Sequence, residues 1–258
     1  MKLVCLNVFG GKYYESLMKF VADQAKDTDV FCFQEVLRAG INTKTKSEFR
    51  INIFSDLKGI LRNFNGYFAV IQKNFEIYES VDGDIYFCQA IFIRKSLKVK
   101  NHRYDTVHKG EEIISDPRLD IPRILQHIQV EARQPLHIFN FHGLSTWPKK
   151  DTKERINQSE RIKNILDKFK SNKIICGDFN MDPDTESVKI IENNMKNLIK
   201  DFNIKSTRPT SLNFKRSVSD YVIVSKDIDV EEFCVMDTKV SDHLPIIVRF
   251  NFKNSEST

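Results

Sequence analysis

Hydrophobic and polar residues divide this chain into two kinds of segment. Short runs dominated by apolar residues are typical of buried strands, whereas apolar residues three or four positions apart are typical of helices that bury one face. The runs predict strands at residues 2–8, 29–33, 67–71, 85–93, 97–107, 124–131, 137–142, 173–176, 220–224, 230–236 and 244–250. The spaced pattern predicts helices at residues 13–25, 48–62, 152–169, 185–193 and 195–199.

The order of these elements predicts the fold class. Strands outnumber helices and fall into two similar halves, each with helices between its strands. This arrangement predicts two sheets packed face to face with helices outside. Because the chain has only 9 Gly and 7 Pro and contains no linker-like stretch, we expect a single domain over residues 1–253 and a disordered tail at 254–258.

Composition and charge narrow the class of protein. Hydrophobic residues make up 41% of the chain and charged residues 29%, which is ordinary for a globular protein and excludes a disordered one. The net charge of +5 suits a polyanionic or phosphorylated partner. On charge alone, a protein that simply happens to be basic is an equally good interpretation.

Cysteine usage and the chain's apolar runs bear on location. The five Cys are odd in number, match no zinc spacing and lie within apolar runs, so we expect buried free thiols in a reducing compartment. The first residues lack the apolar core of a signal peptide. No run of about 18 apolar residues predicts a membrane-spanning helix, and we expect a cytoplasmic protein.

Polar residues stand at the ends of most predicted strands, where a buried strand does not require them. Loops at strand ends on a rigid sheet are where binding and catalytic sites are commonly built. The residues concerned are Asn7, Glu35, His142, Asp178, Asn180, Asp220, Asp242 and His243.

The residue types in this set indicate metal-assisted phosphoester chemistry. Carboxylates and an amide oxygen are hard ligands that suit Mg²⁺ or Mn²⁺, whereas zinc is expected with Cys or closely spaced His. Asp178 and Asn180 stand two residues apart, so one extended segment can direct both at the same reacting group. Such a set can position a water and stabilise charge on phosphoryl oxygens.

Each residue also has a purely structural interpretation. A lone strand histidine such as His142 is usually a structural residue, and Asp220 before a strand is commonly a turn residue. For Asp178, which follows a glycine, a turn or cap role is as good an interpretation as a catalytic one. The occurrence of the whole set in a fixed order favours the functional interpretation.

Six short motifs carry a family resemblance. They are LNVFGG, FQEV, NFHG, CGDFN, SDYVIVS and SDHLP, and they extend from Asn7 to His243. In this order they resemble the endonuclease/exonuclease/phosphatase superfamily, which includes pancreatic-type deoxyribonuclease, abasic-site endonucleases and inositol polyphosphate 5-phosphatases. The resemblance implies an α/β four-layer sandwich of two mostly antiparallel β-sheets packed face to face with helices outside.

The resemblance also implies a metal site and a water-activating residue. Glu35 corresponds to the main metal ligand, with Asn7 and Asp242 beside it. The implied cofactor is Mg²⁺, with Mn²⁺ as an alternative. Asp178 corresponds to the residue that orients or activates the attacking water.

The remaining motif residues would act on the phosphoryl group. The resemblance implies that Asn180 and His142 contact phosphoryl oxygens and that His243 stabilises the transition state or acts as general acid or base. Asp220 would hold the other ring nitrogen of His243. The sequence departs from pancreatic-type deoxyribonuclease because residues 87–89 contain no acidic partner for His142.

Three further residues are candidates for substrate binding. Trp147 lies beside two lysines, where it can stack a base; a hydrophobic anchor for its own loop is the slightly favoured alternative. Arg208 belongs to a basic loop at 205–216, for which a solvated loop is the commoner interpretation. Arg123, at the start of a strand, could face a bound phosphate.

The sequence therefore predicts a monomeric, Mg²⁺-dependent phosphodiesterase that acts on nucleic acid or a nucleotide-like phosphoester by metal-assisted attack of water. Hydrolysis of a phospholipid or an inositol phosphate is an alternative that uses the same site with different surrounding loops. A catalytically inactive phosphate-binding module is a second alternative, which the complete set of site residues disfavours.

Overall fold

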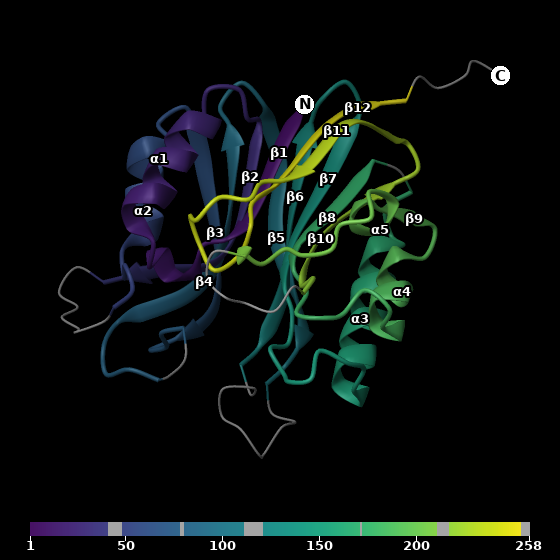
Figure 1. Ribbon diagram of the computed structural model, residues 1–258. Helices are drawn as coiled ribbons and strands as arrows, with labels where there is room; N and C mark the ends of the chain where they lie inside the picture. The colour runs from purple at the N-terminus through teal and green to yellow at the C-terminus, as the bar shows by residue number, and fades with distance from the viewer. Residues whose placement is uncertain (41–47, 78–79, 111–120, 171, 211–216, 254–258) are drawn as a thin grey trace.

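Two six-stranded sheets pack face to face and carry helices on their outer sides in the computed structural model (Figure 1). The structure describes residues 1–40, 48–77, 80–110, 121–170, 172–210 and 217–253, so the predicted tail at 254–258 lies outside the described residues. The predicted α/β four-layer class is confirmed.

The first sheet has the strand order β11-β12-β1-β2-β4-β3. Its strands are β1 (Lys2–Asn7), β2 (Val30–Ala39), β3 (Phe64–Lys73), β4 (Ile85–Arg94), β11 (Ile228–Val235) and β12 (Ile246–Phe252). Strands β1 and β2 run parallel, and the other neighbours are antiparallel. Helices α1 (Tyr14–Gln24) and α2 (Ile53–Ile60) cover its outer face, and the short helix η1 (Phe9–Gly11) follows β1.

The second sheet repeats this plan with the order β5-β6-β7-β8-β10-β9. Its strands are β5 (Lys98–His108), β6 (Arg123–Glu131), β7 (Pro135–His142), β8 (Lys173–Asp178), β9 (Met195–Asn197) and β10 (Asp220–Ser225). Here β7 and β8 form the parallel pair. Helices α3 (Lys153–Leu166), α4 (Glu186–Glu192) and α5 (Leu198–Asp201) lie on the outer side (Figure 1).

Alternation along the strands divides the core into two clusters. Leu3 and Cys5 belong to the cluster that fills the space between the sheets, whereas Val4 and Leu6 belong to the cluster beneath α1 and α2. Successive side chains of a strand point to opposite faces, so β1 contributes to both layers. The apolar runs of the sequence therefore reflect strands that are covered on both sides.

Two predicted helices differ from the structure. The helix predicted at 48–62 begins only at Ile53, because the Arg50 N–H donates to the Gly10 carbonyl and holds that segment against η1. The helix predicted at 195–199 is instead a short strand followed by a helical turn. Asn197 pairs with Ile223 in β10, and its side chain caps the turn by accepting from the Ile199 N–H.

Strand β2 is longer than predicted. The sequence predicts a strand at residues 29–33 with Glu35 just past its end, but β2 continues to Ala39 after a bulge between Phe33 and Val36 in its pairing with β4. A bulge inserts an extra residue and redirects a side chain without ending the strand. Glu35 thus protrudes from the middle of a strand.

Close approach of β7 and β8 explains the glycines of the NFHG and CGDFN motifs. A Cβ atom on Gly177 would lie 1.8 Å from the Phe141 carbonyl oxygen, and one on Gly143 would lie 2.2 Å from that of Phe179. No side chain fits at such distances. Glycine at these positions lets the two strands run side by side up to their last residues.

The cysteines and the helices bear on the remaining fold-level predictions. All five Cys are free thiols; Cys234 is half-buried and the others are buried. Within the described residues, no helix is long and apolar enough to cross a membrane.

Candidate active site

The carboxyl ends of the two parallel strand pairs meet at one end of the sandwich. Asn7 ends β1, and Asp178 ends β8 in the opposite sheet. The Asn7 Nδ2 group donates to Asp178 Oδ2 at 3.2 Å, which joins the two sheets at this point. His142 is the register partner of Asp178. Predicted residues from both sheets thus meet at this end of the sandwich.

Glu35 enters the site from the bulge of β2. Its backbone has a φ of 54°, a left-handed conformation that a non-glycine residue adopts at an energetic cost. The Oε1 atom accepts from Asn7 Nδ2 at 3.0 Å, while the buried Oε2 atom has no hydrogen-bond partner among the described residues. Burial and the nearby Asp242 carboxylate raise the pKa of Glu35 to about 7.

Asp178 stands at the centre of the site. Its Oδ1 atom accepts from the Asn180 backbone N–H at 3.0 Å. Its Oδ2 atom lies 3.4 Å from His243 Nε2 and 3.8 Å from His142 Nε2. One carboxylate oxygen therefore faces both imidazoles. Asn180 also has a left-handed backbone, with φ of 55°, so the segment turns directly after β8.

His243 is held by a carboxylate on its far side. Its Nδ1 atom lies 2.8 Å from Asp220, which also accepts from Thr207 Oγ1 at 2.6 Å and Ser219 Oγ at 3.1 Å. Burial and the Arg208 charge lower the pKa of His243. The surrounding carboxylates, led by Asp220, outweigh them, and the net pKa is above the ordinary value. Nε2 is left to face Asp178.

Asp242 lies at the edge of the site in an ion pair. Arg208 Nη1 donates to Asp242 Oδ2 at 2.6 Å and to its backbone carbonyl at 3.1 Å. Ser241 Oγ donates to the Asn7 carbonyl at 2.7 Å and so links this loop to β1. Arg208 therefore contacts a site carboxylate, a position the sequence did not indicate. Residues 211–216 of its loop lie outside the described residues.

His142 is buried without a carboxylate hydrogen bond. Neither ring nitrogen has a hydrogen-bond partner among the described residues, and the Phe87 ring packs at 6.0 Å. Burial and the Arg123 charge lower its pKa to about 3, so the imidazole is neutral at physiological pH. Residues 87–89 supply no acidic partner for His142, and the Gln89 amide donates to the Asn140 carbonyl.

Arg123 places a buried positive charge beside the carboxylates. The side chain is 2% exposed, and its Nε and Nη1 groups have no hydrogen-bond partner in the described part of the chain. Burial lowers its pKa to about 10, while the charges of Glu35 and Asp178 act in the opposite direction. An unsatisfied buried guanidinium is costly unless an anion binds to it.

The donor set suits a hard divalent cation. Glu35, His142 and Asp178 offer ligand atoms within 4.8 Å of one another, and so do Asp178, Asp220 and His243. In the second group, His243 Nδ1 is already engaged by Asp220. In the first, Glu35 Oε2 is buried without a partner, which fits a cation bound by oxygen ligands.

Asn7 does not present its amide oxygen to the predicted metal position in this arrangement. Its Oδ1 atom accepts from the Phe9 N–H at 3.0 Å, and its Nδ2 group points at Glu35 and Asp178. The amide N–H thus satisfies part of the carboxylate charge. To act as a metal ligand, Asn7 would have to turn its amide.

Trp147 corrects a sequence prediction. A hydrophobic anchor for the loop was the favoured interpretation, but the indole is 86% exposed. The anchor is Arg155 of α3, which is fully buried and donates to backbone carbonyls of the loop. Because a side chain from the following helix holds this loop, Trp147 is not needed to do so.

Two residues of the site region escaped sequence reasoning. Asn140, in the NFHG motif, accepts from the Gln34 amide at 2.6 Å and donates to the Phe33 and Ala90 carbonyls, which ties β7 to the first sheet. Arg155 also donates to the Asn180 carbonyl at 3.0 Å. For Asn140 the signal was a polar residue at the centre of an apolar run.

Comparison with known proteins agrees with this geometry. The model of the endonuclease/exonuclease/phosphatase family matches residues 4–243. No curated protein matches the sequence. Among solved structures, a mannosyl-6-phosphatase of Bacteroides thetaiotaomicron is similar with a TM-score of 0.72 and 16% identity, over 98% of this chain and 100% of that one.

A second solved structure shows the same fold. The human Nocturnin catalytic domain, with a bound sulfate anion, is similar with a TM-score of 0.69 and 18% identity, over 98% of this chain and 94% of that one. At these identities the likeness establishes the fold alone. The family model spans nearly the whole chain, and the protein therefore belongs to the endonuclease/exonuclease/phosphatase family.

Proposed function

We propose that this protein is a Mg²⁺-dependent phosphodiesterase that acts on nucleic acid or a nucleotide-like phosphoester. Members of its family are phosphoester hydrolases. The observation that carries the proposal is the surrounding of Asp178 Oδ2, which both imidazoles and the Asn7 amide approach within 3.8 Å. The buried Arg123, whose Nε and Nη1 groups have no hydrogen-bond partner in the described part of the chain, suits a phosphoryl group.

The metal would be held by Glu35 and Asp242, with Asn7 completing the set after its amide turns. A bound divalent cation would neutralise negative charge on the phosphoryl oxygens. Glu35 is the ligand that the geometry supports best, because its buried Oε2 atom has no hydrogen-bond partner among the described residues.

Asp178 would orient the attacking water and accept its proton. The water oxygen forms the new bond to phosphorus as the bond from phosphorus to the leaving oxygen breaks. His243, protonated and held by Asp220, would give its proton to the leaving oxygen. Neutral His142 and the Asn180 amide would donate hydrogen bonds to the phosphoryl oxygens, and Arg123 would contribute a fixed charge.

A nucleic acid or nucleotide-like substrate is supported by charge and by the rim of the site. The net charge of +5 favours a polyanion. An exposed indole at Trp147 is placed where a base can stack on it. A mannosyl-6-phosphatase has the same fold, so a sugar phosphate is the monoester that any assay must include.

A hydrolysis panel tests the proposal. Purified protein with Mg²⁺ or Mn²⁺, and the same protein with a chelator, would be incubated with single- and double-stranded DNA, abasic DNA, RNA, mannose 6-phosphate, an inositol polyphosphate and sphingomyelin. We expect cleavage of a nucleic acid that requires the metal. Cleavage of the monoester or lipid alone would contradict the substrate class, and no cleavage of any substrate would favour the inactive binding module.

A further inference from the structure

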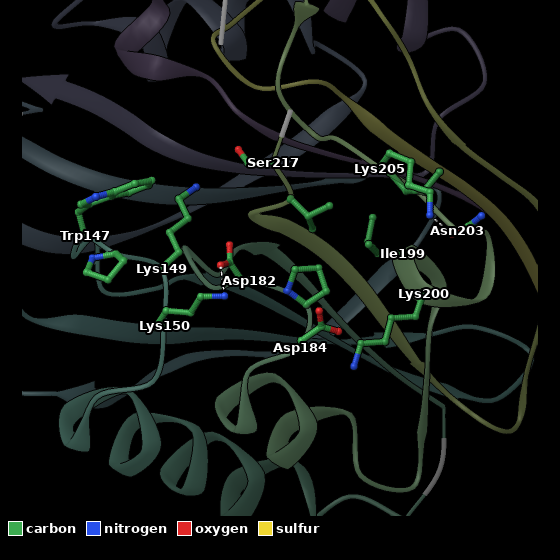
Figure 2. Close-up of a pocket in the computed structure, with 14 residues that line it drawn as sticks. Trp147, Lys149, Lys150, Asp182, Asp184, Ile199, Lys200, Asn203, Lys205 and Ser217 are labelled. Atoms are coloured by element: carbon green, nitrogen blue, oxygen red, sulfur yellow. Dashed lines mark hydrogen bonds and ion pairs between the residues drawn. The ribbon is translucent and has the colours of Figure 1, made fainter. Parts of the chain in front are cut away.

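A cleft of about 630 Å³ opens beside the catalytic centre. Figure 2 shows Trp147 and Lys149 on one side of it and Lys200 and Lys205 on the other. Val218, two residues before Asp220, forms part of its wall. The cleft is lined by segments that adjoin strands carrying the site: residues 147–150 follow β7, residues 182–184 follow β8, and residues 217–218 precede β10.

Trp147 is an exposed aromatic side chain on a fixed loop. The buried guanidinium of Arg155 donates to the carbonyls of Leu144, Thr146 and Pro148 at 2.7 to 3.2 Å, and to that of Lys150 at 2.5 Å. The loop backbone is thus ordered before any ligand arrives. Binding to a preordered loop avoids most of the entropy loss of ordering it.

Lys149 differs from Lys150 and Lys200 in having no carboxylate partner among the described residues. Lys150 pairs with Asp182 at 2.9 Å, and Lys200 pairs with Glu192 at 2.6 Å. The Lys149 ammonium has no ion-pair partner within the described ranges. Burial lowers its pKa, and the Asp178 charge acts in the opposite direction.

The walls of the cleft offer apolar surface against which a flat ring can pack. The apolar lining residues are Pro148, Pro183, Ile199, Ile204 and Val218, and the polar ones include Asp184, Asn203 and Ser217. Asp182, which also lines the cleft, is already engaged by Lys150. A planar base with one anionic group matches an indole beside an unpaired ammonium.

We propose that this cleft is a nucleoside subsite in which Trp147 stacks on the base adjacent to the scissile phosphate and Lys149 contacts a phosphate. This inference rests on the proposed function and names the part of the substrate that the protein recognises. The same chemistry is present in a mononucleotide and in an oligonucleotide, so the experiment must distinguish these two sources.

The sequence contains a single Trp, so intrinsic indole fluorescence reports on Trp147 alone. The wild-type protein, kept in chelator to prevent turnover, would be titrated with adenosine 5′-monophosphate, ribose 5-phosphate and inorganic phosphate. We expect saturable quenching by the nucleotide and at least about tenfold weaker binding of ribose 5-phosphate, because the base supplies the stacking. Equal quenching by both ligands, or none, would overturn the proposal.

Two neighbouring lysines provide a matched control. Lys149→Met should weaken nucleotide binding about tenfold, whereas Lys150→Met should leave it within about twofold because that charge is already paired with Asp182. Equal effects of the two substitutions would refute the role of Lys149. Tighter binding of a dinucleotide than of the mononucleotide would identify a nucleic acid chain as the source of the base.

The kinetic test separates this inference from the proposed function. Oligonucleotides with a base or an abasic residue beside the scissile phosphate would be compared in the wild type and in Trp147→Leu. We expect the wild type to prefer the base-bearing substrate through KM and the variant to lose that preference. Cleavage without any preference would refute the subsite alone. Fluorescence quenching without cleavage would refute the phosphodiesterase alone.

Discussion

The two parallel strand pairs bring residues to the same site by different means. In the first sheet, β1 and β2 end out of step, and Glu35 reaches the site from a bulge with a left-handed backbone. In the second sheet, His142 and Asp178 lie directly side by side in register, which is possible because Gly177 lets the strands approach. A parallel strand pair thus directs a single carboxylate, Glu35, into the site in one sheet and places two side chains, His142 and Asp178, next to each other in the other sheet.

This difference suggests that the two strand pairs have different roles in the site, metal binding for β1 and β2 and contact with the phosphoryl group for β7 and β8. The first pair contributes the Glu35 carboxylate, whose Oε2 atom has no partner among the described residues, and the Asn7 amide N–H group that donates to Oε1. The second contributes an imidazole and a carboxylate, to which the proposed function gives the binding of phosphoryl oxygens and the transfer of a proton. Activity lost by substituting a site residue of β1 or β2 should therefore be restored at high metal concentration, whereas activity lost by substituting one of β7 or β8 should not.

The largest expected effect on activity comes from substituting Asp178, at the end of β8. Asp178→Asn should lower kcat by about 10³-fold, because the amide cannot accept the proton of the attacking water. Raising the Mg²⁺ concentration should not restore activity. The measurement is steady-state kinetics across a metal titration, with circular dichroism to verify folding. Recovery of activity at high metal concentration would show that Asp178 acts as a ligand instead.

The hydrogen bonds of Asn140 that join β7 to the first sheet can be removed by substitution. Asn140→Ala should lower the free energy of unfolding by about 3 kcal/mol, because it leaves buried partners in the first sheet unsatisfied, including the Gln34 amide. Urea denaturation measures this change. Asn65→Ala, on the exposed face of β3, is the matched control and should change stability by less than about 0.5 kcal/mol. Equal losses would contradict a linking role.

Substitution of Glu35, in β2, should cause a loss of activity that a higher metal concentration restores. Glu35→Gln should raise the Mg²⁺ concentration needed for half-maximal activity by on the order of 10- to 100-fold, with kcat at saturating metal largely retained. A metal titration of activity, supported by calorimetry of Mg²⁺ binding, tests this. If saturating metal leaves the variant as impaired as Asp178→Asn, the proposed division of the site is wrong.

The smallest expected effect concerns pH. The strands of the first sheet contain no His, whereas β6 carries His127, whose pKa burial and the His137 charge lower to about 3. The unfolded chain, with a pKa of about 6.5, takes up the proton first. This stabilising contribution is complete above about pH 6.5 and is lost as the pH falls towards 3.

Replacement of His127 removes this titration. Its ring stacks on Phe139 at 4.5 Å, so His127→Phe should preserve the packing. Between pH 7 and 5.5, the wild type should lose stability more steeply than the variant, by at most about 1.4 kcal/mol per pH unit. Urea denaturation at both pH values measures the slopes. Identical slopes would show that His127 does not carry the pH dependence.

Much of the fold was predictable because most strands are buried on both sides and appear as apolar runs. Strand β1 could be located within one residue for this reason. Local patterns failed where a tertiary contact decided the structure. The N-terminal part of the predicted helix at 48–62 is held by a backbone bond to Gly10, and pairing with β10 made Met195–Asn197 a strand.

The motif residues of the site were predictable from their order, and the structure brings them together from distant strands. What could not be predicted is which charges are already paired. Arg208 is engaged by Asp242, whereas Arg123 has unsatisfied N–H groups. Arg155 lies in the helix predicted at 152–169 and is fully buried. A sequence pattern does not reveal that a buried arginine serves the carbonyls of a loop.

The Arg155 contacts imply that the shape of the 144–150 loop is independent of its side chains. Arg155 binds carbonyl oxygens, which every amino acid possesses, at alternate positions of the loop. Residues 145, 147 and 149, between those positions, can therefore be exchanged without refolding the loop. Such a loop is a suitable starting point for changing the ligand preference of this protein: a library randomised at these three positions would present new side chains on the same backbone.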